Sequence, residues 1–583
     1  MKTTKKLMLI HGICLILFIS ALDVHSKSSN DRFVFASYAT LQTLDPCMAY
    51  DTTSHQRILN IYEPLIFFDG SAVDQYIPVL AKDVPSLENG GISKDGLRYK
   101  FTIRQDIQFH EGGKLTAEDV LYSFKRNMIA DPDGGPIWML LEPLIGIGST
   151  RDDQGKLLPE IFNKIDQCIT IENDTITFHL IRPYPPFLSI LCTSVGVILD
   201  KEWAISNECW DGNIKNAKKY NNPKMGQEPL QKIANGTGAY YLKSWEVSRQ
   251  FVFERNDNYW AKKPALKTAI FKFVKEWSTR KMMLQNGDAD RVTVDSTHIP
   301  EVLSIKGLSF YKVPQLSVSG ALFCRKINAS ANPYIGSGKL DGRGIPADFF
   351  SDVHIRKAFL HAFDRKMYRR DVLNNMAIVP TNPNIEGLPY HINTPCYEYD
   401  PYKMIEHLKK AWDGKAWKRG FRMTIVYNTG NEMREAAALM LAENMMALNR
   451  NIQIEVKNVD WKDYLVNYRN YMYPFFLIGW SADYADPHNF IYNFMHSQGV
   501  LGKYIRYHDA KIDQLCEQGI QTVDPAKRRS IYEKLQMAWY ENATGILLYQ
   551  TVNFRAYRDD ISGFLLNPIF SDDWENLKNL YRR

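Results

Sequence analysis

The stretch from Met423 to Val456 reads MTIVYNTGNEMREAAALMLAENMMALNRNIQIEV, and it decides the fold class. Its opening, Met423–Tyr427, is an apolar run with β-branched residues that predicts a strand. An amphipathic pattern then predicts a long helix over 433–448, and a second strand is expected over 452–456. A strand, a helix and a strand in this order form a βαβ unit, which is typical of parallel sheet. We therefore expect the C-terminal half of the chain to be α/β.

A further strand follows this unit and ends in a polar segment. Pro474–Trp480 (PFFLIGW) predicts a central strand, and the chain continues as SADYADPHNF. Ligands of open α/β sheets bind at the carboxyl ends of strands, so Trp480, Ser481 and Asp483 are predicted to lie at a ligand site. A carboxylate in such a place is costly to bury unless a positive group meets it. Asp486, which precedes a proline, is expected to shape the exit turn instead.

Strand and helix signals alternate along the rest of the chain without an internal repeat. The clearest helix start is at Thr116, which is predicted as the N-cap, with Asp119 at the capping-box position. A cluster of Asp, Pro and Gly residues over 131–136 is expected to end that helix. The other predicted elements are strands over 99–104 and 269–274, a hairpin of 242–245 with 250–254, and a helix over 353–363.

Length and composition place the chain among large soluble globular proteins. With 583 residues it exceeds the size of a single core, so several domains or lobes are expected. Its 71 Lys and Arg residues and 65 Asp and Glu residues give a net charge of only +6, and the signs are mixed along the chain. Nucleic acid is therefore not expected as a partner.

The N-terminus has the pattern of a secretory signal peptide over 1–26. MKTTKK supplies the positive region, residues 7–22 are apolar, and Val24-His25-Ser26 offers a cleavage site. We therefore expect export to the periplasm. An uncleaved membrane anchor is the alternative, although the apolar run is shorter than the roughly 20 residues that a membrane span needs.

Seven cysteines follow this segment, and none forms a CxxC pair. Zinc and thioredoxin-like sites are therefore not predicted, and no cofactor or metal is expected. Disulfide pairing is open to these residues in an exported protein, and Cys192 with Cys209 and Cys324 with Cys396 are the closest candidates in sequence. The sequence also lacks the Gly-x-Ser-x-Gly and His-Glu-x-x-His motifs of hydrolases, so catalysis is not predicted.

Five segments of the chain match one protein family in the same order. They begin with LQTLDP at Leu41, YKFTIR at Tyr99, GTGAYY at Gly236, DVHIRK at Asp352 and GWSADY at Gly479. Together they extend over nearly the whole mature chain. In these segments the chain resembles the extracellular solute-binding proteins of family 5, the peptide-binding group that serves ATP-driven importers.

The resemblance implies an α/β, periplasmic-binding-protein type II fold. Two lobes would be joined by hinge strands, and an extra domain would be inserted in the first lobe. The implied division is a signal peptide over 1–26, a first lobe over 27–70, 190–297 and 546–583, an inserted domain over 71–189 and a second lobe over 298–545.

The resemblance also implies a function without catalysis. Such a receptor captures short peptides in the cleft between its lobes and delivers them to the permease subunits of an ABC importer. It is expected to act as a monomer.

The site residues implied by the resemblance lie around the opening of the polar segment. Asp483, three residues after Trp480, would pair with the free α-amino group of the peptide. Trp480 would form the wall of the neighbouring side-chain pocket, and Gly479 and Ser481 would offer backbone groups to an extended ligand. The residues expected on the opposite side of the cleft are Tyr50, Asp51 and Thr52 of the first lobe and Trp138 of the inserted domain.

Two alternatives remain open at this point. The same fold could bind another solute, such as a cell-wall peptide, an oligosaccharide, a nickel chelate or haem. The discriminating feature is Asp483, because an amine requires a carboxylate whereas a sugar requires stacked rings and neutral hydrogen-bonding groups. A secreted hydrolase with an aromatic cleft is the alternative of another class, and the sequence offers it no recognisable nucleophile or metal set.

Overall fold

The computed structural model describes residues 31–583 apart from 153, 296–297 and 571–573. The signal peptide predicted over 1–26 lies outside the described residues. Within the described part, no helix combines the length and the apolar composition that a bilayer crossing requires.

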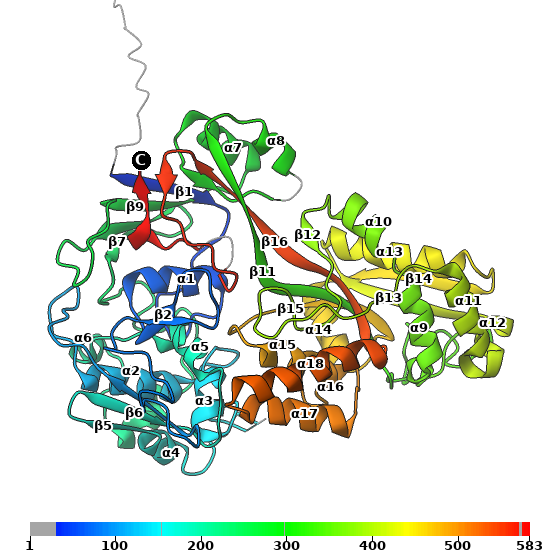
Figure 1. Cartoon of the computed structure of the whole chain (residues 1–583), viewed down its shortest axis with the longest axis horizontal. Coiled ribbons are helices and arrows are strands. Elements are labelled where there is room, and N and C mark those ends of the chain that lie inside the picture. The colour runs from blue at the N-terminus through cyan, green and yellow to red at the C-terminus, as the bar shows by residue number, and fades with distance from the viewer. Residues whose placement is uncertain (1–30, 153, 296–297, 571–573) are drawn as a thin grey trace, which may run out of the picture.

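An eleven-stranded sheet runs through the molecule and connects its two lobes (Figure 1). The main path has the order β14-β13-β15-β11-β16-β10-β1-β9-β8-β7, and β12 pairs with β16 beside it. The strands are β1 (Arg32–Ser37), β7 (Tyr240–Glu246), β8 (Gln250–Arg255), β9 (Thr268–Phe273), β10 (Arg291–Val292), β11 (Leu308–Phe323), β12 (Ala377–Ile378), β13 (Phe421–Asn428), β14 (Ile452–Val459), β15 (Phe475–Ser481) and β16 (Gly545–Arg558).

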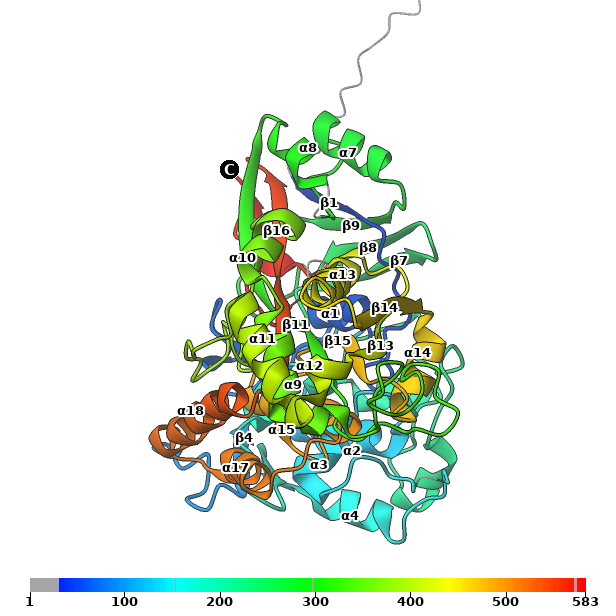
Figure 2. The same ribbon diagram turned by 90° about the vertical axis from the view of Figure 1, so that its right-hand side faces the viewer.

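Two long antiparallel strands, β11 and β16, join the lobes. Their pairing extends from Leu308 opposite Arg558 to Leu322 opposite Gly545, and its register shifts twice, between Pro314 and Val318 and between Ser319 and Gly320. In Figures 1 and 2 both strands pass from the part of the sheet that contains β10 to the part that contains β15. They are the hinge strands that the predicted fold class requires.

We call lobe I the part built on β1 and β7 to β10, and lobe II the part built on β13 to β15. Lobe I carries α1 (Thr52–Ile61), α7 (Trp277–Asn286) and α8 (Ile299–Leu303). Lobe II carries α9 (Val353–His361), α10 (Arg365–Met367), α11 (Pro401–Lys410), α12 (Lys415–Arg419), α13 (Glu432–Met446), α14 (Trp461–Arg469), α15 (Pro487–Met495), α16 (Val500–Tyr504), α17 (Ala510–Gln521) and α18 (Pro525–Glu541).

A separate three-stranded antiparallel sheet of order β4-β6-β5 lies in the region predicted as the inserted domain, and we keep that name for the region around it. Phe178 of this sheet contacts Phe124 of the neighbouring helix edge to face, with ring centroids 4.8 Å apart. The exact limits predicted for the domains, such as 71–189 for the insertion, stay predictions. The elements of this region are β4 (Arg98–Thr102), β5 (Ile169–Glu172), β6 (Thr175–His179), α2 (Ala117–Ala130), α3 (Trp138–Ile145), α4 (Ile161–Gln167), α5 (Phe187–Leu191) and α6 (Lys201–Ser206).

The local elements predicted from the sequence are present. Asp119 accepts a hydrogen bond from the backbone N–H of Thr116 at 2.8 Å, which forms the predicted capping box of α2. Strands β13 and β14 are parallel neighbours joined through α13, as the βαβ pattern predicts. Strand β15 lies between β13 and β11, and its residues Phe475 to Ile478 are buried. The predicted central strand is confirmed.

The suggested disulfides are wrong, because all seven cysteines of the described chain are free thiols. Cys209 instead contacts the guanidinium of buried Arg126, while the Cys192 thiol donates to the carbonyl oxygen of Leu188 on its own helix. Cys324 is buried just after β11, whereas Cys396 lies half-buried in a loop near Glu398. Packing places each thiol in its own environment, which spacing along the chain does not reveal.

Candidate functional site

Asp483 forms a hydrogen bond that crosses from lobe II to lobe I. Strand β15 ends at Ser481, and Asp483 follows in the loop before α15. Its Oδ1 accepts a hydrogen bond from the Tyr50 hydroxyl at 2.7 Å, and Tyr50 lies just before α1 of lobe I. Its Oδ2 accepts a hydrogen bond from Nδ2 of Asn489 at 3.2 Å. The predicted site residues Asp483 and Tyr50 are thus in direct contact.

Two tryptophans extend this contact into a hydrogen-bonded chain. Trp138, at the start of α3 in the inserted domain, donates from Nε1 to the Tyr50 hydroxyl at 3.1 Å. Trp480 donates from Nε1 to Oδ1 of Asn489 at 3.0 Å, so its indole is oriented beside Asp483. Both lobes and the inserted domain therefore contribute to one site. Sequence reasoning missed Asn489, although its place in the first turn of α15, next to the polar segment, is a usable signal.

The Asp483 carboxylate has neutral partners. Burial raises the pKa of its carboxyl group above the usual range, although the hydrogen bonds from Tyr50 and Asn489 oppose this shift. Burial and the neighbouring carboxylate likewise raise the pKa of the Tyr50 phenol. Within the described part of the chain, no Lys, Arg or His forms an ion pair with Asp483. The negative charge is therefore hydrogen-bonded but not neutralised.

The outer part of β15 has a free edge beside Asp483. In the described residues β13 pairs with β15 at Phe475 and Phe476 only, whereas β11 pairs with β15 along its whole length to Ser481. Gly479 lies in this outer part of β15, and its role toward a ligand stays a prediction. Ser481 is exposed at the strand end, and its hydroxyl lies 2.9 Å from that of Ser317 on β11.

Arg434 brings a positive charge to the face of the sheet at Gly479. It lies in the first turn of α13 and donates to Ser319 Oγ at 2.9 Å and to Asn428 Oδ1 at 2.7 Å. A Cβ atom on Gly479 would stand 2.6 Å from Nη2 of Arg434, so the guanidinium lies directly against this glycine. No carboxylate of the described residues forms an ion pair with Arg434. Sequence reasoning missed this residue, although the loop and helix after a parallel strand are where such groups gather.

The remaining predicted residues lie around Tyr50 on lobe I. The Asp51 carboxylate accepts a hydrogen bond from the backbone N–H of Ser54 at 2.8 Å, so it caps α1. Thr52 is the exposed first residue of that helix. Tyr50 and Asp51 also line a hollow that opens to solvent. The other residues that line it are Gln42, Met48, Pro132, Asp133, Gly134, Gly135, Asn222, Pro223, Lys224 and Met225.

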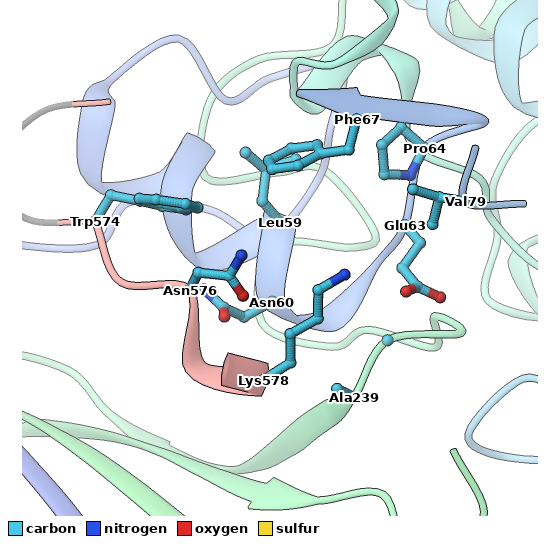
Figure 3. A pocket seen from close by; sticks show the side chains of 11 residues that line it. Leu59, Asn60, Glu63, Pro64, Phe67, Val79, Ala239, Trp574, Asn576 and Lys578 are labelled. Atoms are coloured by element: carbon cyan, nitrogen blue, oxygen red, sulfur yellow. The ribbon is translucent and has the colours of Figure 1, made fainter. Parts of the chain in front are cut away.

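A small cavity lies within lobe I and is shown in Figure 3. Its prominent acidic group is Glu63, whose carboxylate already accepts hydrogen bonds from Tyr259, Trp260 and Thr237. Asn60 in the same cavity donates to the carbonyl oxygen of Glu575. These polar groups serve the packing of lobe I, so the cavity is not the candidate site.

Comparisons with known proteins agree with this architecture. Residues 75–502 match the family described as bacterial extracellular solute-binding proteins, family 5 Middle. The dipeptide-binding protein of Escherichia coli (strain K12) is 23% identical over 581 residues, which cover 97% of each chain.

Solved structures support the same fold. The ABC transporter-associated periplasmic binding protein DppA from Helicobacter pylori in complex with peptide STSA has a TM-score of 0.68 at 22% identity, covering 94% of this chain and 98% of that chain. NikZ from Campylobacter jejuni in complex with Ni(L-His) has a TM-score of 0.67 at 20% identity, covering 95% and 100%. The predicted type II periplasmic-binding fold is confirmed. The chain therefore belongs to the bacterial extracellular solute-binding proteins of family 5, which are non-catalytic receptors.

Proposed function

We propose that this protein captures short peptides with a free α-amino group between its lobes and delivers them to the permease of an ABC importer in the cell envelope. The observation that carries the proposal is the Asp483 carboxylate, which is half-buried, lies just beyond the carboxyl end of β15 and has neutral partners. A ligand ammonium would supply the missing positive charge. Hydrogen bonds to charged groups contribute roughly 1.5 to 3 kcal/mol each.

The position of Tyr50 indicates how the ammonium would enter. Its hydroxyl donates to Asp483 Oδ1 at 2.7 Å, a distance that an ammonium N–H donor would also adopt. The ligand would therefore replace the phenol at this oxygen. Asn489 would continue to hold Oδ2, and the tryptophans Trp138 and Trp480 would bound the same space.

The free edge of β15 supports an extended ligand. Backbone N–H and C=O groups near Gly479 can pair with a peptide as a further strand does. Such backbone pairing does not depend on the side chains of the peptide. Arg434, which touches Gly479 and has no carboxylate partner in the described residues, would meet a ligand carboxylate. A zwitterionic peptide matches the two unneutralised charges. An uncharged sugar would leave both of them unpaired.

Calorimetric titration of peptides tests the proposal. Asp483→Ala should weaken the binding of trialanine far more than the binding of N-acetyl-trialanine, because only the former carries an ammonium. Asp413→Asn is the matched control, since Asp413 is 93% exposed at its side chain on lobe II. Equal losses for the free and the acetylated peptide would remove the ammonium role from Asp483.

The identity of the natural ligand needs a second measurement. Native mass spectrometry of the purified protein should show peptide masses that disappear after mild denaturation and refolding. A sugar or a nickel chelate in their place would overturn the peptide assignment, while family membership would stand. Delivery to an importer is tested in cells. Cells that lack this protein should not take up labelled peptides, and complementation with its gene should restore the uptake.

A further inference from the structure

Two histidines face each other between helices α9 and α11 of lobe II. Nδ1 of His354 lies 2.9 Å from Nδ1 of His407, and the ring centroids are 5.1 Å apart with planes inclined by 31°. Both side chains are half-buried, so solvent reaches them. Figure 1 shows α9 and α11 at the right-hand end of the molecule, away from α3 and the end of β15. The pair plays no part in the proposed peptide site.

The contact has a definite protonation requirement. In an N–H···N bond one imidazole donates, and the other must present an unprotonated nitrogen. At least one ring is therefore neutral, and it presents a lone pair toward the other. Neutral imidazole nitrogens are the preferred ligands of Zn²⁺, Ni²⁺ and Cu²⁺ in proteins.

We propose that His354 and His407 together bind one divalent transition-metal ion through their Nδ1 atoms. Metal–nitrogen bonds of 2.0 to 2.1 Å at a tetrahedral angle place two nitrogens about 3.3 Å apart. The observed 2.9 Å therefore requires an opening of about 0.4 Å. This is a small movement for side chains on two packed helices. On binding, the imidazole that donated its Nδ1 proton carries the proton on Nε2 instead, and water completes the coordination.

A third histidine, His361, packs against the site and is not proposed as a metal ligand. The His361 ring stacks on that of His407, with centroids 5.9 Å apart and planes inclined by 14°. Its Nδ1 is 2.7 Å from the carbonyl oxygen of Glu398, which fixes the orientation of the ring. The backbone of His354 is held as well, because Asp352 accepts its N–H at 2.7 Å as the cap of α9. The two candidate ligands are therefore presented by restrained side chains, which lowers the entropic cost of binding an ion.

The alternative to a metal site is a hydrogen bond between the two helices that involves no ion. Metal titration distinguishes the metal site from this hydrogen bond. The full chain, purified without a polyhistidine tag and treated with chelator, should bind one Zn²⁺ or Ni²⁺ ion in calorimetric titrations with the metal chloride alone. His354→Gln and His407→Gln should each weaken metal binding by more than about tenfold. Loss of a residue that only supports a metal ligand already costs about tenfold in affinity, and loss of a ligand should cost more. The double variant should bind no more weakly than either single one, because one imidazole cannot chelate.

Controls keep this result distinct from unfolding and from the peptide site. His508→Gln should leave metal affinity unchanged, since the side chain of His508 is 77% exposed at a different place on lobe II. Asp483→Ala should also bind the metal normally, whatever its effect on peptides. Circular dichroism should show the histidine variants folded, and Cu²⁺ added to the wild type should give an electron paramagnetic resonance spectrum with coupling to two imidazole nitrogens. Absence of a bound ion in the wild type, or full affinity in both single variants, would overturn the site.

Discussion

Removal of one oxygen atom, by Tyr50→Phe, should strengthen peptide binding. The Tyr50 hydroxyl donates to Asp483 Oδ1 at 2.7 Å and joins lobe I to lobe II. If a peptide ammonium takes the same oxygen, the phenol competes with the ligand. The phenylalanine variant retains the ring and loses the competitor. The indole N–H of Trp138 donates to that hydroxyl at 3.1 Å and would lose this acceptor in the variant. The contact is exposed, so water can accept the hydrogen bond instead.

The magnitude follows from the type of bond. A hydrogen bond to a charged group contributes about 1.5 to 3 kcal/mol. The Tyr50 side chain is 44% exposed, so we take the lower end of that range. A difference of about 1.4 kcal/mol corresponds to a tenfold change in Kd, so the variant should bind free-amine peptides about tenfold more tightly. The affinity for N-acetylated peptides should rise much less, because they bring no ammonium to Asp483.

Isothermal titration with trialanine and its N-acetyl form measures both affinities. Tyr402→Phe is the matched control, since Tyr402 is 85% exposed on lobe II and should show no change. Small-angle scattering should also show that unliganded Tyr50→Phe is more open than the wild type, because one contact between the lobes is lost. Weaker trialanine binding by the variant would refute the reasoning. It would mean that the hydroxyl and the ligand bind Asp483 together rather than in turn.

Two further predictions concern stability. The pKa of Asp483 is raised in the folded protein, so its ionisation destabilises the unliganded fold above that pKa, and the penalty is relieved as the pH falls through it. Asp483→Asn should therefore raise the Tm at pH 7, with a difference that shrinks toward acidic pH; a lower Tm at pH 7 would contradict this. Asp486→Ala should cost about 3 to 5 kcal/mol in urea denaturation, because it leaves the buried guanidinium of Arg528 without its carboxylate. A loss below about 1 kcal/mol would show that water reaches Arg528.

Local structure was predictable where neighbours in sequence determine it. The capping box of Thr116 and Asp119 needs only residues three apart, and the βαβ unit needs only the change of periodicity along 423–456. The position of Asp483 at a strand end was predictable for the same reason. These features depend on backbone geometry over a few residues.

The partners within the site were not predictable in this way. Tyr50 and Asp483 are 433 positions apart, and their contact depends on how the two long strands β11 and β16 set one lobe against the other. Arg434 reaches Gly479 only because β13 and β15 diverge after two paired positions. The resemblance to a family supplied Tyr50 as a candidate, whereas the place of Arg434 after a parallel strand is a general signal that does not single out this residue. Contacts between lobes follow from tertiary packing, which periodicity does not encode.

The polar segment that contains Asp483 and Asp486 shows how the fold separates a charge that is neutralised inside the protein from one that is not. Asp486 caps α15 and accepts hydrogen bonds from Nη1 and Nη2 of Arg528, both at 2.8 Å, so its charge is compensated inside the protein. Asp483, three residues earlier, is satisfied by the hydroxyl of Tyr50 and the amide of Asn489, which supply hydrogen bonds but no positive charge. Any external ammonium gains both the hydrogen bond and the ion pair, and the gain is largest when the lobes are closed around it. If the proposed function holds, the neutral contact between Tyr50 and Asp483 joins the lobes and would be replaced by the charged group of the ligand.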